Sequence, residues 1–535
     1  MKKCKRYILA SVLLGLMSSC LEDDNNYNYT PVNELVGGAY NFKNFEDRYS
    51  VVQGGELTFS PTFKFTIDSV TPDVSYQWYL DKKPLPDETK SAYTFKAEKN
   101  GTFQVTFEVT DNKSGVKFGK SAIVKVRSIY QRGWAILSDD NGRSVLHFIV
   151  PKTVKYETEL NGETLTRDSL VYHQVLRDVV PNLGQNPIGL INDVGNMDYY
   201  SSFGISVYDE LVVKQDRWVE LNGNTLEREV YTDEEFYGDL PENFSPMEAA
   251  MSYSSKAILD ENGLIYWQKK ANIVDFHAGA YLPIGINNNT HFSRLFQTLR
   301  VNDYKTDVML ALRKEDNSLV GILDMGNAVG DSPDITDNSS YTSGNMHEIT
   351  DFVSESRFLK IKKDIIDAIP CPYDSYKDVT SAYPYWVVLL KDPKSTEYEL
   401  RYFGINAEKR SIECIEGEYY EASLGVINDY RDWANFGIKR YVVIADGNQL
   451  YYYQYGWDPD GGREYKGQLM KLGEPFTSPI KSLSGLDLQA YGSECPYSGQ
   501  LAIALEDGSL YIMGVVETKD EIGICTKVAL EQLFP

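Results

Sequence analysis

From residue 131 to the end, one pattern of apolar and polar positions recurs. A short apolar run leads into a polar turn rich in Asp, Asn and Gly, and a second apolar run follows. Asn-Gly and Asp-Gly pairs supply the positive φ angles with which a tight turn joins two twisted antiparallel strands. Each copy therefore predicts a β-hairpin, and we place seven copies, anchored on Trp134, Val207, Ile258, Met309, Val387, Val442 and Ala502.

The repeat predicts a circular architecture. The anchors lie about sixty residues apart, which exceeds the ~40–50 residues of a compact four-stranded blade. One blade cannot bury both faces of its sheet, whereas several blades packed around an axis do so. We therefore predict an all-β chain with a seven-bladed β-propeller over 131–535; six or eight blades stay open, because the copies at Val207 and Val387 are weak. The surplus residues are expected in loops at 178–203, 225–250 and 325–384, with helical spacing only briefly at 352–369.

A shorter alternating pattern covers residues 48–130 and predicts a separate β-sandwich. Trp78 stands in one strand, as a large apolar body between two sheets does in immunoglobulin-like cores. The segment 100–111 turns every second residue to one face, namely Phe103, Val105, Phe107 and Val109. That segment resembles the penultimate strand of PKD domains, and the whole region resembles a PKD-like β-sandwich. The usual acidic-glycine motif is absent, and such domains act more often as spacers than as catalysts.

Residues 1–19 read as a secretory signal peptide. Four basic residues precede an apolar stretch that is too short to span a bilayer. The run Leu16-Met17-Ser18-Ser19-Cys20 resembles a bacterial lipobox, in which the cysteine is acylated and becomes the mature N-terminus. An ordinary cleavage site with an incidental cysteine is the alternative interpretation. The lipobox implies an outer-membrane protein that is anchored by lipid at Cys20.

The residues directly after the lipobox resemble a second localisation signal. Glu22, Asp23 and Asp24 resemble the acidic export signal that places Bacteroidetes lipoproteins on the extracellular side of the outer membrane. A plain acidic linker is the alternative. The polar, Asn-rich composition that follows is typical of a flexible tether, which we place over 20–47.

Charge and cysteine content exclude several classes of function. Lys and Arg total 53 against 77 Asp and Glu, a net charge of −24, so the chain lacks the basic balance of a nucleic-acid-binding protein. The mature chain keeps four cysteines beyond Cys20, and their spacing is not that of a zinc site. Three disulfide pairings or free buried thiols are all compatible with the positions Cys371, Cys414, Cys495 and Cys525.

No recognisable catalytic motif is present. The chain contains no GxSxG elbow, HExxH motif, P-loop or GxGxxG, and its five histidines are far apart. We therefore expect no metal, no cofactor and no catalysis, and we interpret the acidic turn at 458–462 as a surface turn, with calcium as a less favoured alternative. A glycosidase stays open, because it needs only two carboxylates at the right separation.

Aromatic residues in predicted loops are the positive signal for binding. Exposed Tyr and Trp give rigid, amphipathic contact area for sugars or peptides. Our candidates for ligand contact are Tyr383, Tyr385, Tyr455 and Trp457. For any single one of them, packing between blades is the competing interpretation.

Taken together, the lipobox, the sandwich and the segment Gly133-Trp134-Ala135-Ile136-Leu137-Ser138 resemble the PKD-like family lipoproteins of Bacteroidetes. The resemblance implies an accessory surface lipoprotein of a SusC/SusD-like nutrient importer, which captures an oligopeptide or oligosaccharide without catalysis. A propeller glycoside hydrolase on the cell surface and a protein-binding adhesin are the alternatives.

Overall fold

The computed structural model describes fifteen stretches of the chain. They are 33–67, 71–131, 133–160, 163–192, 210–251, 255–269, 279–297, 307–324, 345–371, 385–408, 411–437, 440–455, 467–487, 499–517 and 522–530. The chain forms two compact units, Met1–Ile129 and Tyr130–Pro535. Within the described stretches, no helix is both long and apolar enough to cross a membrane.

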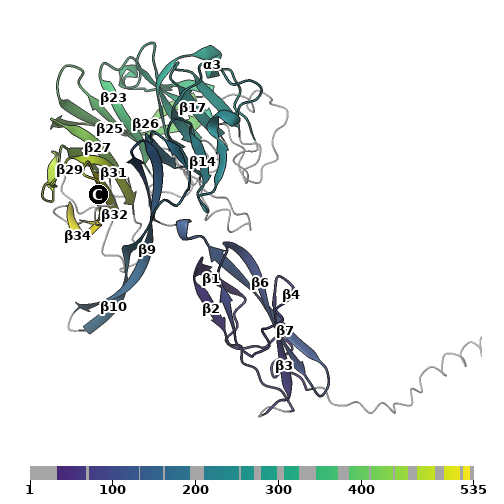
Figure 1. Cartoon of the computed structure of the whole chain (residues 1–535). Helices are drawn as coiled ribbons and strands as arrows, with labels where there is room; N and C mark the ends of the chain where they lie inside the picture. Colours follow the sequence, from purple (N-terminus) through teal and green to yellow (C-terminus); the bar gives the residue numbers. More distant parts are fainter. Residues whose placement is uncertain are drawn as a thin grey trace, which may run out of the picture. The chain divides into compact units, whose positions relative to one another are not determined.

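The first unit is a β-sandwich (Figure 1). Its larger sheet has the order β1-β7-β6-β3-β4, with bounds Arg48–Val52, Lys117–Arg127, Gly101–Asp111, Val74–Leu80 and Lys83–Pro84. The smaller sheet pairs β2 (Glu56–Phe59) with β5 (Tyr93–Lys96). Trp78 is fully buried between the sheets, with its ring centroid 4.7 Å from that of Phe107. The all-β sandwich around Trp78 is thus confirmed.

Among the described residues, the second unit contains seven successive groups of hydrogen-bonded strands, which we number as seven sheets. The first holds β8 (Trp134–Asp140), β9 (Arg143–Leu160), β10 (Glu163–Leu176) and β11 (Gly184–Gln185). The second holds β12 (Gly189–Asn192), β13 (Glu210–Lys214), β14 (Val219–Asn222) and β15 (Arg228–Tyr231). The third holds β16 (Pro246–Met251), β17 (Ser255–Asp260) and β18 (Ile265–Lys269).

The remaining four sheets are four-stranded. The fourth holds β19 (Phe292–Phe296), β20 (Asp307–Arg313), β21 (Ser318–Asp324) and β22 (Asn345–Thr350). The fifth holds β23 (Asp364–Cys371), β24 (Tyr385–Lys391), β25 (Glu397–Glu408) and β26 (Ser411–Val426). The sixth holds β27 (Tyr430–Phe436), β28 (Tyr441–Asp446), β29 (Gln449–Gln454) and β30 (Met470–Leu472). The seventh holds β31 (Ile480–Asp487), β32 (Gly499–Leu505), β33 (Leu510–Glu517) and β34 (Ile522–Leu530).

Short helical turns complete the described structure: η1 (Ile129–Gln131), η2 (Thr232–Glu234), α3 (Ile286–Asn289) and η4 (Glu355–Arg357). The fourth and fifth sheets are joined by a parallel pairing of β22 with β26, at Ile349 opposite Ile412 and Thr350 opposite Glu413. These two sheets therefore form one continuous eight-stranded sheet.

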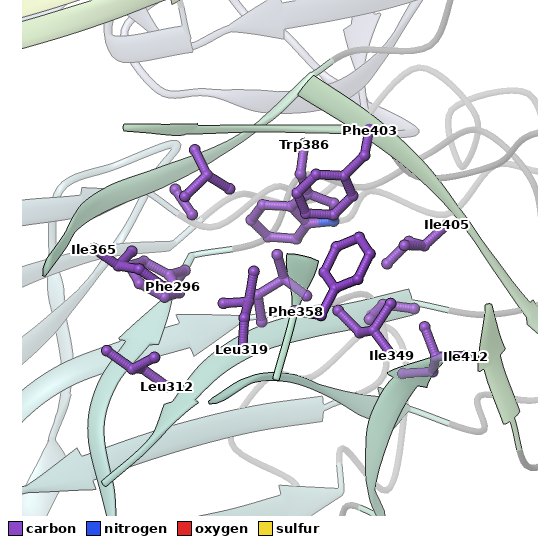
Figure 2. Packing of buried hydrophobic residues seen from close by; sticks show 14 of the residues in the cluster. Phe296, Leu312, Leu319, Ile349, Phe358, Ile365, Trp386, Phe403, Ile405 and Ile412 are labelled. Atoms are coloured by element: carbon purple, nitrogen blue, oxygen red, sulfur yellow. The ribbon is translucent and has the colours of Figure 1, made fainter. Parts of the chain in front are cut away.

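The seven sheets close into a ring, because every sheet packs on both neighbours. Six apolar clusters join consecutive sheets, and the one between the fourth and fifth, around Trp386 and Phe403, is drawn in Figure 2. A seventh cluster joins the last sheet to the first, through Ala502, Leu510 and Ile512 against Trp134 and Ile149. A closed ring of sheets that each bury both faces is a β-propeller, and the described residues form seven blades, the number predicted from the repeat.

The predicted hairpins occupy the second and third strands of most blades. β28 and β29 show why the pattern was visible: residues 441–445 are all buried, since one face of the strand contacts the fifth sheet and the other contacts the seventh. The turn between β8 and β9 has Asn141 at φ 53° and Gly142 at φ 86°, as an Asn-Gly turn requires. The copy placed at Val207 lies outside the described residues, and the hairpin of the second sheet is β13–β14.

The predicted loops and the helical stretch need correction. The interval 225–250 contains β15 and most of β16, and the described parts of 178–203 and 325–384 contain β11, β12, β22 and all of β23. The interval 352–369 forms η4 and the start of β23 instead of an amphipathic helix. The sequence pattern therefore located the middle of each blade better than its first and last strands.

Candidate functional site

The predicted site residues are only partly within the described structure. Cys20, Glu22, Asp23 and Asp24 lie outside it, as do Tyr383, Trp457 and the acidic turn at 458–462. Two candidates can be placed, Tyr385 and Tyr455. The lipidation, export and half of the aromatic hypotheses therefore stay predictions.

The two placed aromatics belong to the packing between the fifth and sixth blades. Tyr455 is fully buried, and its hydroxyl donates a hydrogen bond of 2.6 Å to Asn435 Oδ1. Its ring centroid lies 5.1 Å from that of Tyr402, on which half-buried Tyr385 stacks at 5.5 Å. Because no face of the Tyr455 ring reaches solvent, we correct its assignment from ligand contact to packing between blades.

A different group of side chains gathers on the first strands of the blades. In the third to seventh sheets the first strand carries a β-bulge at a matching place, where the pairing register shifts by an extra residue. Bulges redirect side chains and are frequent beside functional sites. Charged residues stand at or directly after four of these bulges: Glu248, Arg294, Asp367 and Asp432. We call these four residues the axial cluster.

The strands that carry the axial cluster are neighbours around the ring. β16 contacts β19, β19 contacts β23, β23 contacts β27, and β27 contacts β31. Two ion contacts join consecutive members: Arg294 Nε lies 2.6 Å from Glu248 Oε1, and Arg294 Nη2 lies 3.7 Å from Asp367 Oδ1. The side chains are 19% exposed for Glu248, 31% for Arg294 and 36% for Asp367, so solvent reaches the cluster.

The acidic members also tie each blade to the next. Glu248 Oε2 accepts a 2.5 Å hydrogen bond from the backbone N–H of Leu295, and Asp432 Oδ2 accepts one of 2.7 Å from that of Leu483. Asp367 Oδ2 accepts a 2.8 Å bond from the indole Nε1 of Trp433. In all three cases the donor lies within two residues after the bulge in the first strand of the next blade. Charged acceptors of this kind make strong, directional links.

Electrostatics distinguish the cluster from an ordinary surface ion network. Burial raises the pKa of Asp367 above the usual aspartate range, against the lowering effects of Trp433 and Arg294. Burial also raises the pKa of Asp432, and the negative charge of Asp367 adds to that shift. Burial lowers the pKa of Lys214, at the end of β13, whose ammonium senses both Glu248 and Arg294. Charged groups held where burial disfavours their charge are typical of binding and catalytic sites.

The arrangement supports binding better than proton transfer. A general acid or base must reach its substrate with a carboxyl oxygen, and hydrogen bonds from the protein occupy part of the acceptor capacity of that oxygen. Each carboxylate oxygen of Asp367 and Asp432 already accepts a hydrogen bond from the protein, the second pair coming from the backbone N–H groups of Ala368 and Trp433. Within the described residues, no group of three His, Cys, Asp or Glu side chains is placed to hold a metal ion. Cys414 is a free, buried thiol, and burial raises its pKa to about 11, which disfavours the reactive thiolate.

The axial cluster was missed in the sequence. Its signal is one charged residue within a short apolar run upstream of each hairpin, as in Met247-Glu248-Ala249-Ala250 and Ile365-Ile366-Asp367-Ala368. A charge in such a run looks like the end of a strand, because the bulge that accommodates it has no signature of its own. The cluster became recognisable only when the ring brought these positions together.

We expect replacement of Asp367 by alanine to cost about 1–3 kcal/mol of unfolding free energy, since the buried indole N–H of Trp433 loses its acceptor. Asp367→Asn keeps an oxygen acceptor and removes the charge. Because the folded-state pKa of Asp367 is raised, its contribution to stability is full at low pH and is lost as pH rises through that pKa. Urea unfolding between pH 4 and 7 measures this effect. As pH rises, the free energy of unfolding of the asparagine variant should increase relative to that of the parent protein. Asp364→Asn, at the exposed start of the same strand, is the control. If the difference in unfolding free energy between the parent and Asp367→Asn stays constant with pH, the raised pKa of Asp367 is contradicted.

The closed ring of seven blades and its axial cluster make this chain a β-propeller protein with an N-terminal β-sandwich. Residues 20–178 match the model of the PKD-like family. The match runs through the sandwich and on to the end of β10, and it confirms the PKD-like character predicted for the N-terminal part. No curated protein matches the chain.

Solved structures give distant likenesses. A quinoprotein alcohol dehydrogenase-like protein from Bacteroides thetaiotaomicron has 10% identity and a TM-score of 0.35, over 93% of this chain and 96% of that one. Prp20p from Saccharomyces cerevisiae has 10% identity and a TM-score of 0.35, over 67% and 80%. The WD40 domain of SCAP from fission yeast has 7% identity and a TM-score of 0.31, over 64% and 70%. At these TM-scores, the propeller assignment depends on the chain's own sheets and clusters.

Proposed function

We propose that this protein is a lipid-anchored, non-catalytic binding protein on the outer face of the outer membrane. In this proposal Cys20 carries the lipid, and Glu22, Asp23 and Asp24 direct the chain to the surface. The tether and the sandwich hold the propeller away from the membrane, and the propeller binds an oligopeptide or oligosaccharide beside a SusC/SusD-like importer. The lipobox and the PKD-like match over 20–178 support the anchor and the family context.

The observation that carries the binding role is the axial cluster. The carboxyl groups of Asp367 and Asp432 are partly exposed on the first strands of adjacent blades, and burial disfavours their charged state. Protein structures retain such groups where a ligand uses them. The carboxylate oxygens of Asp367 and Asp432 are engaged with protein donors, which favours recognition over hydrolysis.

A propeller glycoside hydrolase is the second candidate. The observation that favours it is the pair Asp367 and Asp432, two carboxylates with raised pKa values, of which one senses the charge of the other. Hydrolysis of a polysaccharide panel by the purified protein, abolished in both Asp367→Asn and Asp432→Asn, would establish this function in place of the binding role.

We expect Cys20→Ser to remove the protein from the membrane. Stable anchoring requires acyl chains, so the membrane-bound fraction should fall roughly tenfold or more, and mass spectrometry should find no acylated N-terminus. Cys4→Ser, in the predicted signal peptide, is the matched control and should leave anchoring unchanged. Affinity purification of the parent protein from native membranes should recover a TonB-dependent transporter. An unacylated parent protein, or repeated purification without any such transporter, would refute the proposal.

A further inference from the structure

We propose that one face of the sandwich docks on anionic lipid headgroups of the membrane in which the lipid on Cys20 is inserted. We call it the basic face, and it consists of two residues of β1 and three of β7: Arg48, Val52, Ile123, Lys125 and Arg127. The inference rests on the proposed lipid anchor and goes beyond it, because it gives the sandwich a binding surface of its own.

The strand register places the basic face on the outer side of the larger sheet. β1 and β7 are adjacent and parallel (Figure 1), and their register sets these residues opposite one another: Arg48 and Ile123, Ser50 and Lys125, Val52 and Arg127. Alternate residues of a strand point to opposite sides of its sheet. Val124 and Val126 are buried in the core, whereas all five residues of the basic face are exposed.

The sandwich neutralises other lysines of β7 but not the cations of the basic face. Lys117 Nζ lies 2.8 Å from Glu108 Oε1, and Lys120 Nζ lies 2.9 Å from Asp47 Oδ1. Among the described residues, no carboxylate is in ion-pair contact with the three cations of the basic face. An external anion can therefore approach these cations without displacing a partner.

The side chains that surround these cations carry no charge. Ser50 lies on β1 opposite Lys125, and on the adjoining β6 Thr102 and Gln104 lie opposite Lys125 and Ile123. Val52 and Ile123 are 41% and 40% exposed. A surface with cations, hydroxyl groups and exposed apolar side chains suits the boundary of a bilayer, where cations meet anionic headgroups and apolar side chains meet hydrocarbon.

The distribution of charge along the chain also favours the sandwich as the part that contacts the membrane. Residues 33–130 contain 13 Lys and Arg against 12 Asp and Glu, whereas 131–535 contain 36 against 62. An anionic bilayer therefore repels the propeller. The sandwich is close to neutral, so its unpaired cations can determine which of its faces a bilayer attracts.

The tether is long enough for this contact. The segment 21–32 separates Cys20 from the described chain and spans at most about 45 Å. Leu35 then pairs with Phe65, whose ring packs on Phe118 near the start of β7. From Phe118 to the far end of β7 the strand covers about 30 Å. A lipid on Cys20 thus allows the basic face to reach the same membrane, and the short tether keeps its effective concentration high, so a weak affinity suffices.

Vesicle co-sedimentation of the full mature chain without its lipid tests this inference. Cys20→Ser removes the acyl chains, so binding then depends on the protein surface alone. We expect binding to vesicles of phosphatidylcholine mixed with phosphatidylglycerol and none to phosphatidylcholine alone. Added salt should weaken the binding, because it screens the charges.

Two triple variants in the Cys20→Ser chain identify the surface. The test variant neutralises the basic face: Arg48→Gln, Lys125→Gln and Arg127→Gln. Each basic residue near an anionic bilayer contributes about fivefold, so binding should fall roughly a hundredfold. The control neutralises three exposed lysines outside β1, β6 and β7, and it should bind like the unchanged surface: Lys64→Gln, Lys83→Gln and Lys96→Gln. Thermal unfolding of both variants separates lost binding from lost structure.

Three results would overturn the inference: vesicle binding that ignores lipid charge, equal binding by the test and control variants, or binding of the three cations to an acidic polysaccharide such as polygalacturonate with no binding to vesicles. None of these depends on acylation. A native protein without a lipid on Cys20, whose basic face still binds anionic vesicles, would instead refute the proposed anchor and leave the docking surface in place.

Discussion

Replacement of Lys256 by methionine should cost about 3–5 kcal/mol of unfolding free energy, among the largest losses expected for any single substitution in the propeller. Lys256 is fully buried in β17, and its ammonium lies 2.6 Å from Glu220 Oε2 and 2.7 Å from Glu235 Oε2. The two glutamates are buried as well, with side chains 1% and 4% exposed. Methionine keeps the apolar stem but leaves two carboxylates facing one another without their shared cation.

A compensating variant separates charge from packing. Lys256→Met combined with Glu220→Gln and Glu235→Gln removes all three charges and keeps the volume, so it should recover most of the loss. Urea unfolding monitored by tryptophan fluorescence measures each variant. A loss below about 1 kcal/mol for the single substitution, or no recovery in the triple variant, would show that the second and third blades do not depend on this buried ion group.

Replacement of Trp78 by alanine should cost about 3–5 kcal/mol in the sandwich. The indole is fully buried against Phe107 and Tyr93, at centroid separations of 4.7 and 5.3 Å, and its Nε1 donates a 2.9 Å hydrogen bond to the carbonyl of Lys90. Truncation leaves a cavity between the two sheets and an unpaired carbonyl. For a domain of this size, such a loss approaches its whole stability.

Trp78→Phe is the informative companion, because it keeps an aromatic ring in the core and removes the bond to Lys90. It should cost clearly less than the alanine variant. Limited proteolysis that cleaves within Met1–Ile129, while the propeller stays intact, gives the readout. Equal resistance of the alanine variant and the parent protein would contradict the central role assigned to Trp78.

The middle strands of the blades could be predicted because both their faces are buried. In β28 every residue from Tyr441 to Ala445 contacts a neighbouring blade, so the strand reads as a continuous apolar run, and the Asp-Gly turn that follows marks its end. First strands gave no such signal. β16, β19, β23 and β27 each interrupt their apolar run with a charged residue, and their bulges break the period of two.

The apolar residues at 352–369 show how a β-bulge can give a strand the residue spacing of a helix. Phe358, Ile361, Ile365 and Ala368 all pack in the cluster between the fourth and fifth blades, at intervals of three and four residues. These are helical intervals, yet they arise from an irregular segment followed by a strand. The bulge between Ile365 and Asp367 adds one residue to the alternation, so Ile365 and Ala368 face the same side.

The candidate site residues were harder to predict than the fold. The number of aromatic residues suggested ligand contacts, yet Tyr455 packs between two blades. Sequence alone does not separate these roles, because a blade interface and a ligand site both use large aromatic side chains. The axial cluster draws one residue from each of four sheets, across an interval from 248 to 432. No local motif encodes such a group, since the ring closure alone makes its members neighbours.

The apolar cluster that joins the last blade to the first has a consequence for the order of assembly. Trp134 and Ile149 pack against Leu510 and Ile512, which are synthesised several hundred residues later. Contacts so distant in sequence form slowly, and until they form two blade faces stay uncovered. The ring of this propeller can therefore close only after its seventh blade has been synthesised, so truncation within that blade would leave the first blade with one uncovered face.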